Sequence, residues 1–243
     1  MGSEVKRIGK HVHLGCGLTT PTDWINIDGS WNARLAKYPS LIRLLRQLHI
    51  VPDSQLTIPW NPDILIHDLR KPLPFTDNSV DAIYSSHTLE HLYLNEAQTL
   101  LTQCLRVLRP GGILRIVVPD LNAIIAEYNS QQALDSSPAE IHQLTPADRI
   151  NRRLLLRHPA APSGNIIYRL YTALFDFHSH KWMYDAESLT YYFQKVGFTN
   201  IQSMSLHQSR IPGIEQVELP ERVINGAGIC IEGIKPELNG TNA

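Results

Sequence analysis

The sequence is poor in cysteine and has no long apolar run. Its 243 residues include three cysteines, Cys16, Cys104 and Cys230, and no two of them form a Cys-x-x-Cys pair. This spacing argues against a disulfide framework and against a cysteine-based zinc site, and it fits the reducing cytoplasm. No stretch approaches the roughly 18 apolar residues of a transmembrane helix, and the opening segment MGSEVKRIGK lacks the apolar core of a secretion signal. We therefore expect a cytoplasmic protein without a membrane partner.

An excess of charge of either sign is also missing. Lysine and arginine together number 22, against 23 aspartate and glutamate residues, so the formal net charge is −1. This balance gives no general attraction to nucleic acid or to an anionic membrane. The four tryptophans and nine tyrosines are not interleaved with basic residues as a base-stacking platform. The sequence thus favours a small-molecule partner over nucleic acid, and it leaves the oligomeric state open.

Short apolar runs alternate with helical patterns over most of the chain. The apolar runs predict strands at residues 11–17, 24–28, 64–69, 80–86, 113–120, 199–207 and 226–234. A capping pair, Asn95 and Gln98, predicts the start of a helix that ends at Pro110, and a second amphipathic helix is predicted over 186–198. This order predicts a single α/β domain over residues 1–243, with a doubly wound, mostly parallel, seven-stranded sheet.

Two segments do not fit the alternation of strands and helices. Residues 29–63 and 121–180 are predicted to be helical insertions, and residues 236–243 a disordered tail. Ligands of such sheets bind beyond the carboxyl ends of the strands. Because the second insertion follows the fifth strand at that edge, we expect it to close over the bound ligand.

Three predicted strands end in residues suited to a nucleotide-like ligand. Gly15-Cys16-Gly17 ends the first strand, and its glycines let the backbone approach a ligand where a Cβ would clash. Asp28 ends the second strand, where a carboxylate can accept both hydroxyls of a ribose. Asp68 ends the third, where a carboxylate can accept from an adenine amino group. Their shared edge predicts one binding crevice.

Residues 85–92, SSHTLEHL, contain the His-x-x-Glu-His pattern of inverted zinc peptidases. In those enzymes two histidines hold the metal and the glutamate acts on a bound water. Here the predicted helix starts only at Asn95, so His87 and His91 are expected to precede it, and no third ligand is evident on a following helix. We therefore predict that they bind no metal, and zinc hydrolysis is the weaker alternative.

Four stretches within residues 11–120 can be compared with a known family. They read HLGCG, INID, HDLRKPLPFTDNSVDAIYSSHTLEHL and RVLRPGGILRIVVPD, and HKWMYDAESLTYYFQKVGF follows more loosely over 180–198. Together they resemble the successive motifs of class I S-adenosylmethionine-dependent methyltransferases, specifically the type 11 group. The resemblance implies a Rossmann-like methyltransferase fold, S-adenosyl-L-methionine as the cofactor, and an LEHL segment that lines the cofactor crevice without metal.

The resemblance also indicates which residues contact the cofactor. These are His13, Gly15, Cys16, Gly17, Asp28, Asp68, Leu69, Ser85 and His87. The chain departs from the family at two of its motif positions, with His13 in place of an acid and Thr19 in place of a third glycine. Only residues 18–23 separate the glycine turn from the second strand, which leaves no room for the usual first helix.

Methyl transfer requires an aligned acceptor and, for many acceptors, a base that removes a proton. The predicted catalytic residues are His180, His87 and Asp120, with His180 as the general base because an imidazole titrates near operating pH. The predicted acceptor-binding residues are His178, Lys181, Tyr184, Arg149 and Arg153. Any one of His87, Asp120, His178, His180 and Tyr184 is more often a cap, a packing contact or a hydrogen-bond partner than a base.

The arginines of the second insertion follow a helical spacing. Thr145 and Pro146 predict a helix start, and Arg149, Arg153 and Arg157 then share one face. A solvated helix face explains this spacing, and so does recognition of a carboxylate or phosphate on the acceptor.

The leading hypothesis is therefore a methyltransferase that acts on an oxygen or nitrogen of a small acceptor. A cofactor-binding module of the same fold without turnover is the alternative, favoured by the residues at positions 13 and 19.

Overall fold

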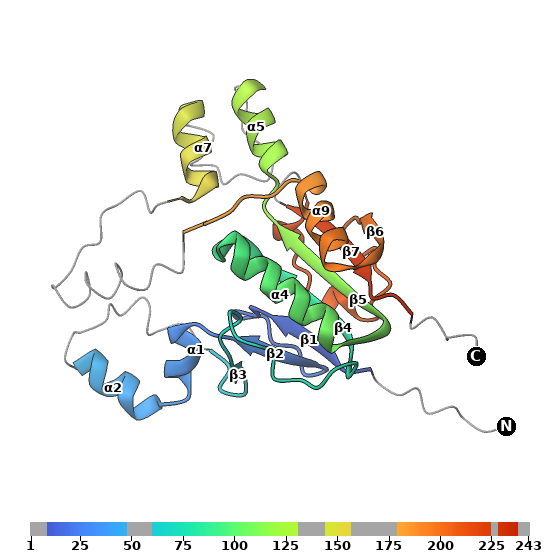
Figure 1. Ribbon diagram of the computed structural model, residues 1–243. Helices are drawn as coiled ribbons and strands as arrows, with labels where there is room; N and C mark the ends of the chain where they lie inside the picture. Colours follow the sequence, from blue (N-terminus) through green and yellow to red (C-terminus); the bar gives the residue numbers. More distant parts are fainter. Residues whose placement is uncertain (1–8, 48–59, 131–143, 157–178, 225–227, 238–243) are drawn as a thin grey trace, which may run out of the picture.

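The computed structural model describes residues 9–47, 60–130, 144–156, 179–224 and 228–237. A seven-stranded sheet in the order β3-β2-β1-β4-β5-β7-β6 forms the centre of the molecule (Figure 1). Its strands are β1 (His11–Leu14), β2 (Trp24–Asp28), β3 (Leu65–Ile66), β4 (Val80–Ser86), β5 (Leu108–Val118), β6 (Thr199–Ser203) and β7 (Ile229–Ile234). β1 to β5 pair in parallel, and β7 lies antiparallel between β5 and β6. The predicted mostly parallel sheet is confirmed.

Helices cover the sheet and extend beyond its carboxyl edge. They are α1 (Trp31–Ala36), α2 (Pro39–Gln47), α4 (Leu94–Val107), α5 (Leu121–Ser130), α7 (Pro146–Leu154) and α9 (Ala186–Val196), with 3-10 turns η1 (Leu89–His91), η2 (Ile214–Gln216) and η3 (Pro220–Arg222). α4 and α9 pack on one face, and α5 and α7 lie side by side beyond the end of β5 (Figure 1). No helix in these described ranges is both long and apolar enough to cross a bilayer.

Two apolar layers hold the sheet. The larger layer packs α4 and α9 against the sheet, through residues such as Leu100, Leu101 and Phe193. On the other face, Ile211 and Ile214 pack on side chains of β2, β4 and β5. Both residues belong to the segment that carries η2. Residues 15–23, which connect β1 to β2, contain no helix that could add to this second layer.

Several predicted boundaries need correction. The third strand is Leu65–Ile66 only, so Asp68 follows the strand by two residues instead of ending it. The Asp68 side chain turns back and accepts from the Arg70 amide at 3.1 Å, which ends the extended run. The long helix is capped at Tyr93, whose amide donates to Glu96 Oε2 at 3.0 Å, and not at Asn95.

The described parts of the two predicted insertions are helical. α1 and α2 lie within 29–63, and α5 and α7 lie within 121–180. Glu127 links α5 to α7. Its two carboxylate oxygens lie 3.3 Å from Arg149 Nε and 3.3 Å from Arg153 Nε, both in α7. The predicted tail falls mostly on residues 238–243, outside the described residues.

Candidate active site

The glycine turn after β1 meets the end of β2 at the carboxyl edge of the sheet. Asp28 is only 8% exposed, and its Oδ2 accepts a hydrogen bond from the Gly17 amide at 3.0 Å. Its Oδ1 accepts from the Ser30 amide at 2.7 Å. A carboxylate offers about four lone-pair positions, so roughly two remain for a ligand. The strand-end acid is therefore fixed in place by the backbone and still able to accept from a ligand hydroxyl.

The two glycines of this turn have different surroundings. Both have left-handed backbone angles, with φ of 65° at Gly15 and 54° at Gly17. A Cβ at Gly15 would overlap the side chain of Thr88, so this glycine lets the turn pack against the segment after β4. A Cβ at Gly17 would meet nothing within 4 Å. The turn is thus closed at Gly15 and borders open space at Gly17, as a ligand cradle requires.

His13, Cys16 and Ser85 lie close to this cradle, but their side chains have other partners. His13 is 2% exposed between the rings of Trp24 and Tyr84, and burial lowers its pKa to about 3, so the imidazole is neutral where the family usually carries an acid. The Cys16 thiol packs in a small apolar cluster. The Ser85 hydroxyl donates to the Leu14 carbonyl at 3.1 Å.

The predicted adenine-side residues also have partners within the protein. Asp68 forms a two-pronged ion pair with Arg70, with Nε at 2.9 Å and the second guanidinium nitrogen at 2.8 Å, and this pair lowers the pKa of the carboxyl. Leu69 belongs to the main apolar layer. A ligand can therefore bind the Asp68 carboxylate only alongside, or in place of, the Arg70 guanidinium.

A cluster of three histidines around one glutamate occupies the carboxyl edge beside β4. Glu90, in η1, is fully buried, and its Oε1 lies 3.7 Å from His87 Nδ1, 3.9 Å from His91 Nε2 and 3.9 Å from His180 Nε2. The rings of His91 and His180 meet edge to face, with centroids 4.9 Å apart. We call these four residues the Glu90 cluster. The structure therefore unites the SSHTLEHL motif with the distant His180.

Burial controls the protonation of the Glu90 cluster. Removal of the carboxylate from water raises the pKa of Glu90 to about 8. The same desolvation lowers the pKa of His87 to about 4 and that of His180 to about 4. In the free protein at neutral pH these side chains are therefore uncharged, although they are acids and bases within reach of one another.

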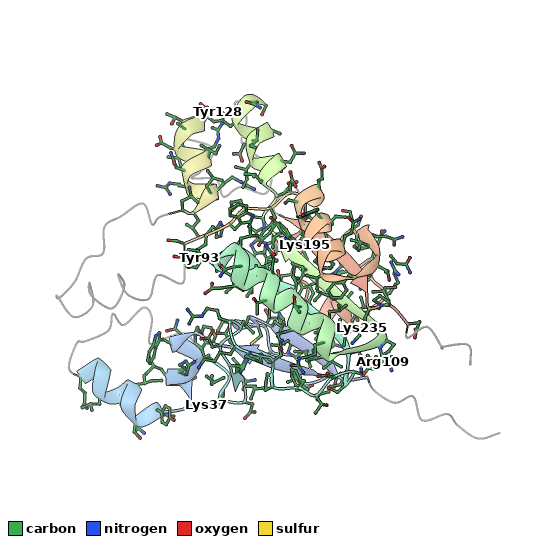
Figure 2. All side chains as sticks on the ribbon, viewed as in Figure 1. Lys37, Tyr93, Arg109, Tyr128, Lys195 and Lys235 are labelled. Atoms are coloured by element: carbon green, nitrogen blue, oxygen red, sulfur yellow. The ribbon has the colours of Figure 1, made fainter. Side chains whose placement is uncertain are left out.

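Backbone hydrogen bonds hold the returning chain against this cluster. The amides of Lys181 and Trp182 both donate to the Glu90 carbonyl, at 2.7 and 3.2 Å. The amide of His180 donates to the Leu155 carbonyl, just after α7, at 2.9 Å. The Lys181 ammonium lies 5.6 Å from the centroid of the Tyr93 ring, which Figure 2 shows at the end of α4 away from Arg109.

Tyr184 and Asp120, both predicted to be site residues, lie next to each other. They form an isolated parallel β-bridge, and the Leu121 amide donates to the Tyr184 carbonyl at 2.8 Å. Asp120 Oδ1 accepts from the Asn122 amide at 2.9 Å, so this carboxylate caps the start of α5. The Tyr184 hydroxyl is buried without a hydrogen-bond partner among the described residues, and the Glu90 carboxyl contributes to the rise of its pKa after burial.

The two predicted acceptor arginines have a structural partner. Arg149 is only 4% exposed and donates to the Leu144 carbonyl at 2.8 Å, and both Arg149 and Arg153 face Glu127. They therefore join α5 to α7 instead of lying on a solvated helix face, and their role toward the acceptor stays a prediction. Two further predicted positions, His178 and Arg157, lie outside the described residues.

Glu90 is the site residue that the sequence analysis did not select. In the sequence, Glu90 stands out only as part of the His-x-x-Glu-His pattern, and the lack of an evident third ligand argues against that pattern as a metal site. A glutamate between two histidines and directly after a strand of seven residues was the available signal. The missing information was the position of His180, which supplies the third ligand-type side chain whose absence argued against metal.

A family comparison covers the part of the chain that carries the glycine turn and Asp28. Residues 12–116 match the family model described as a methyltransferase domain. This match, over residues 12–116 of the 243, supports a class I S-adenosylmethionine-dependent methyltransferase domain. This confirms the predicted family, and with it S-adenosyl-L-methionine as the cofactor. No curated protein matches the sequence.

Solved structures similar to this chain share little sequence with it. A SAM-dependent methyltransferase from Archaeoglobus fulgidus is 14% identical over 93% of this chain and 86% of its own, with a TM-score of 0.45. One from Thermotoga maritima is 16% identical over 93% of this chain and 82% of its own, with a TM-score of 0.41. Phosphoethanolamine N-methyltransferase 2 from Haemonchus contortus, in complex with S-adenosyl-L-methionine, is 12% identical over 94% and 49%, with a TM-score of 0.44.

The cradle of the methyltransferase domain fits its cofactor. The open space at Gly17 lets a ligand approach the backbone closely. Asp28 retains acceptor positions suited to ribose hydroxyls. When bound, S-adenosyl-L-methionine supplies an electrophilic methyl group. The residues that would hold it are those of the glycine turn together with Asp28.

A branched side chain at Gly17 is expected to weaken cofactor binding. Gly17→Val places a side chain in the open space of the cradle and on a backbone with φ of 54°, which a β-branched residue disfavours. We expect the dissociation constant for S-adenosyl-L-methionine, measured by calorimetric titration, to rise about tenfold or more. Gly213→Val, at another left-handed glycine remote in sequence from the turn, is the matched control. Unchanged affinity in folded Gly17→Val would place the cofactor elsewhere.

Proposed function

We propose that this protein transfers a methyl group from S-adenosyl-L-methionine to an oxygen or nitrogen of a small-molecule acceptor that binds beside the Glu90 cluster. The observation that supports this assignment is the shared edge. The cofactor cradle follows β1 and β2, and the cluster follows the neighbouring strand β4. A Cβ added at Gly15 would overlap the Thr88 side chain, so the glycine turn packs directly against the segment after β4. This contact brings the two parts of the site together.

The Glu90 cluster is the proposed place where the acceptor loses its proton. His87 and His91 retain 23% and 26% side-chain exposure, so the cluster is open to a ligand on their side, while His180 is 8% exposed. Tyr184 and Lys181 border it through the returning chain. We propose these residues, with His180, as the acceptor side of the site.

Arg149 and Arg153 remain the proposed contacts for a carboxylate or phosphate on the acceptor. Both guanidinium groups face Glu127, which is 3% exposed, and this one carboxylate balances only one of their two positive charges. Asp120 serves as a helix cap, which leaves the Glu90 cluster as the stronger candidate for acid–base work.

The function is tested by measuring cofactor binding and turnover separately. The purified protein is titrated with S-adenosyl-L-methionine, and then incubated with methyl-labelled cofactor and fractionated metabolite pools. We expect binding, and labelled product together with S-adenosyl-L-homocysteine in at least one fraction. Binding without transfer to any fraction favours the non-catalytic module, and absence of binding contradicts both.

Loss of the Asp28 carboxylate is expected to abolish most cofactor affinity. Asp28→Ala removes the acceptor for ribose hydroxyls and also the anchor of the Gly17 and Ser30 amides. Removal of charge-assisted hydrogen bonds costs about 2 kcal/mol or more, or roughly thirtyfold in the dissociation constant. Asp23→Ala, at an exposed aspartate before the start of β2, carries the same change of charge and should bind normally. An Asp28→Ala protein that folds and binds like the Asp23→Ala control would refute the ribose assignment.

A further inference from the structure

The spacing in the Glu90 cluster is unusual for hydrogen-bonded side chains. Ligand-type atoms of Glu90, His91 and His180 all lie within 4.8 Å of one another, and each histidine Nε2 is 3.9 Å from Glu90 Oε1. Direct N–H···O bonds join atoms about 2.7–3.2 Å apart. Two donor atoms on one zinc ion, each about 2.0–2.2 Å from it, are roughly 3.4 Å apart in a tetrahedral site and at most about 4.2 Å apart. The two 3.9 Å distances from Glu90 Oε1 are therefore too long for direct hydrogen bonds and lie within the range for two donors on one ion. The spacing of the His91 and His180 nitrogens, which lies within 4.8 Å, must be about 4.2 Å or less when the ion is bound.

The Glu90 carboxyl group lacks the partners that a buried carboxylate needs. Both of its oxygens are fully buried and neither has a hydrogen-bond partner among the described residues. Burial of a carboxyl group without such partners is costly, and buried carboxylates in proteins are paired or coordinate metals. The side chain faces three imidazoles and forms no ion pair with a lysine or arginine among the described residues, although the charge of Arg222 is near enough to lower its pKa. A cation between Glu90, His91 and His180 would satisfy all three groups.

Two of the three histidines, His91 and His87, are oriented to present a lone pair to this carboxyl group. His91 Nδ1 lies 3.3 Å from the Ser179 carbonyl oxygen, which can only accept, so Nδ1 carries the hydrogen and Nε2 keeps its lone pair. A second nitrogen that donates to a backbone carbonyl is the usual support of a metal-binding histidine. His87 follows the same rule, because its Nε2 lies 3.1 Å from the Arg222 carbonyl and its Nδ1 faces Glu90.

We propose that Glu90, His91 and His180 bind a divalent transition-metal ion of the zinc class, with His87 available as a fourth ligand. Two or three imidazoles with one carboxylate suit Zn²⁺ and its neighbours in the first transition row better than Mg²⁺ or Ca²⁺. The partly exposed side formed by His87 and His91 leaves room for an oxygen of the acceptor as a further ligand, and this last point rests on the proposed function. With the ion bound, His180 is a ligand, and the cation favours loss of the acceptor proton by lowering the pKa of the coordinated oxygen.

The SSHTLEHL motif then has a function of its own in this fold. The expectation that it binds no metal depended on the lack of a third ligand, and His180 removes that objection. The pattern of an inverted peptidase is not needed, because η1 is a single 3-10 turn and the third ligand comes from the chain that returns after α7.

Metal binding is tested on the full chain without a histidine tag and without cofactor or acceptor. Chelator-treated protein is titrated with Zn²⁺ by calorimetry, and bound metal is counted by mass spectrometry after dialysis. We expect one equivalent per chain. His180→Ala and Glu90→Gln should each bind about a hundredfold more weakly or worse, at or beyond the losses seen when supporting groups are removed. His11→Ala, at the opposite end of β1, should bind like the unchanged protein.

A second measurement does not depend on whether the variants fold. Co²⁺ added to the unchanged protein should give the visible absorption bands of a low-symmetry site with nitrogen and oxygen ligands, and Zn²⁺ should displace it. Absence of stoichiometric Zn²⁺ together with an aqueous Co²⁺ spectrum would overturn the proposal, and so would equal binding by His180→Ala, Glu90→Gln and the His11→Ala control. Because these assays contain no S-adenosyl-L-methionine, their failure leaves the methyltransferase assignment intact, and a failure of methyl transfer leaves the metal result intact.

Discussion

Arg115→Met is expected to lower the free energy of unfolding by about 3 kcal/mol or more, because it leaves the buried Glu218 without a cation and leaves Glu232 only the part-exposed Arg210, 3.9 Å away. Arg115, Glu218 and Glu232 all have fully buried side chains. The guanidinium donates to both oxygens of Glu218, at 2.8 and 2.9 Å, and to Glu232 at 2.8 Å. Two further bonds of 3.0 Å reach backbone carbonyls at Gln208 and Ser205.

This network joins three parts of the fold. Arg115 lies in β5, Glu232 lies in the antiparallel neighbour β7, and Glu218 follows η2 on the covering segment. Arg115 and Glu232 are also paired in the register of the two strands. Loss of the cation should therefore loosen the second apolar layer, and with it the support behind β4 and the site.

Urea denaturation followed by circular dichroism measures the effect, with Arg109→Met as the matched control. Arg109 also pairs with an aspartate, Asp81, but its side chain is 60% exposed, so the control should change stability by less than about 1 kcal/mol. Replacing both carboxylates as well, in Arg115→Met/Glu218→Leu/Glu232→Leu, should restore part of the loss, since no buried charge is then unpaired. Equal stability of Arg115→Met and Arg109→Met would show that the network contributes little.

The sheet was predictable where apolar runs have sharp ends. The strands at 24–28 and 80–86 have the predicted bounds, because polar or turn residues flank a buried run on both sides. The run at 64–69 reduced to two strand residues, because β3 is an edge strand with β2 as its one neighbour in the described sheet, and the Asp68 turn ends it. The start of α4 was misplaced because Tyr93 with Glu96 has the same three-residue spacing as Asn95 with Gln98.

The candidate site was predictable only where adjacent strands bring it together. Gly17 and Asp28 follow neighbouring parallel strands, so their contact follows from the sheet alone. No such rule places His180, which lies far along the chain from Glu90. Its amide donates to the Leu155 carbonyl, and the amides of the next two residues, Lys181 and Trp182, donate to the Glu90 carbonyl. The same holds for the arginines of α7. Their helical spacing was predictable from the sequence, but their contact with Glu127 was not, because Glu127 lies on another helix.

His180→Ala is expected to lower turnover by about a hundredfold or more, while the dissociation constant for S-adenosyl-L-methionine stays within about twofold. His180 is 9% exposed, and its Nε2 faces Glu90 Oε1 at 3.9 Å, on the side of the site formed by η1 rather than by the glycine turn. The substitution removes a group of the proposed acceptor site. Turnover should fall whether His180 acts as a metal ligand or takes the acceptor's proton itself. It leaves Gly17 and Asp28 unchanged, which is why cofactor binding should survive.

The measurement is single-turnover transfer of a labelled methyl group to the acceptor found by screening, with calorimetric titration of the cofactor alongside. His11→Ala serves as the control, because this histidine lies in β1 at the end remote from the glycine turn and should retain full turnover. Normal turnover of His180→Ala would remove the Glu90 cluster from the reaction. Lost cofactor affinity with the fold intact would instead show that the returning chain closes over the cofactor, so that the acceptor must enter from the side of α1. A loss of turnover that added Zn²⁺ reverses would indicate that His87, Glu90 and His91 still hold an ion weakly, in agreement with a ligand role for His180.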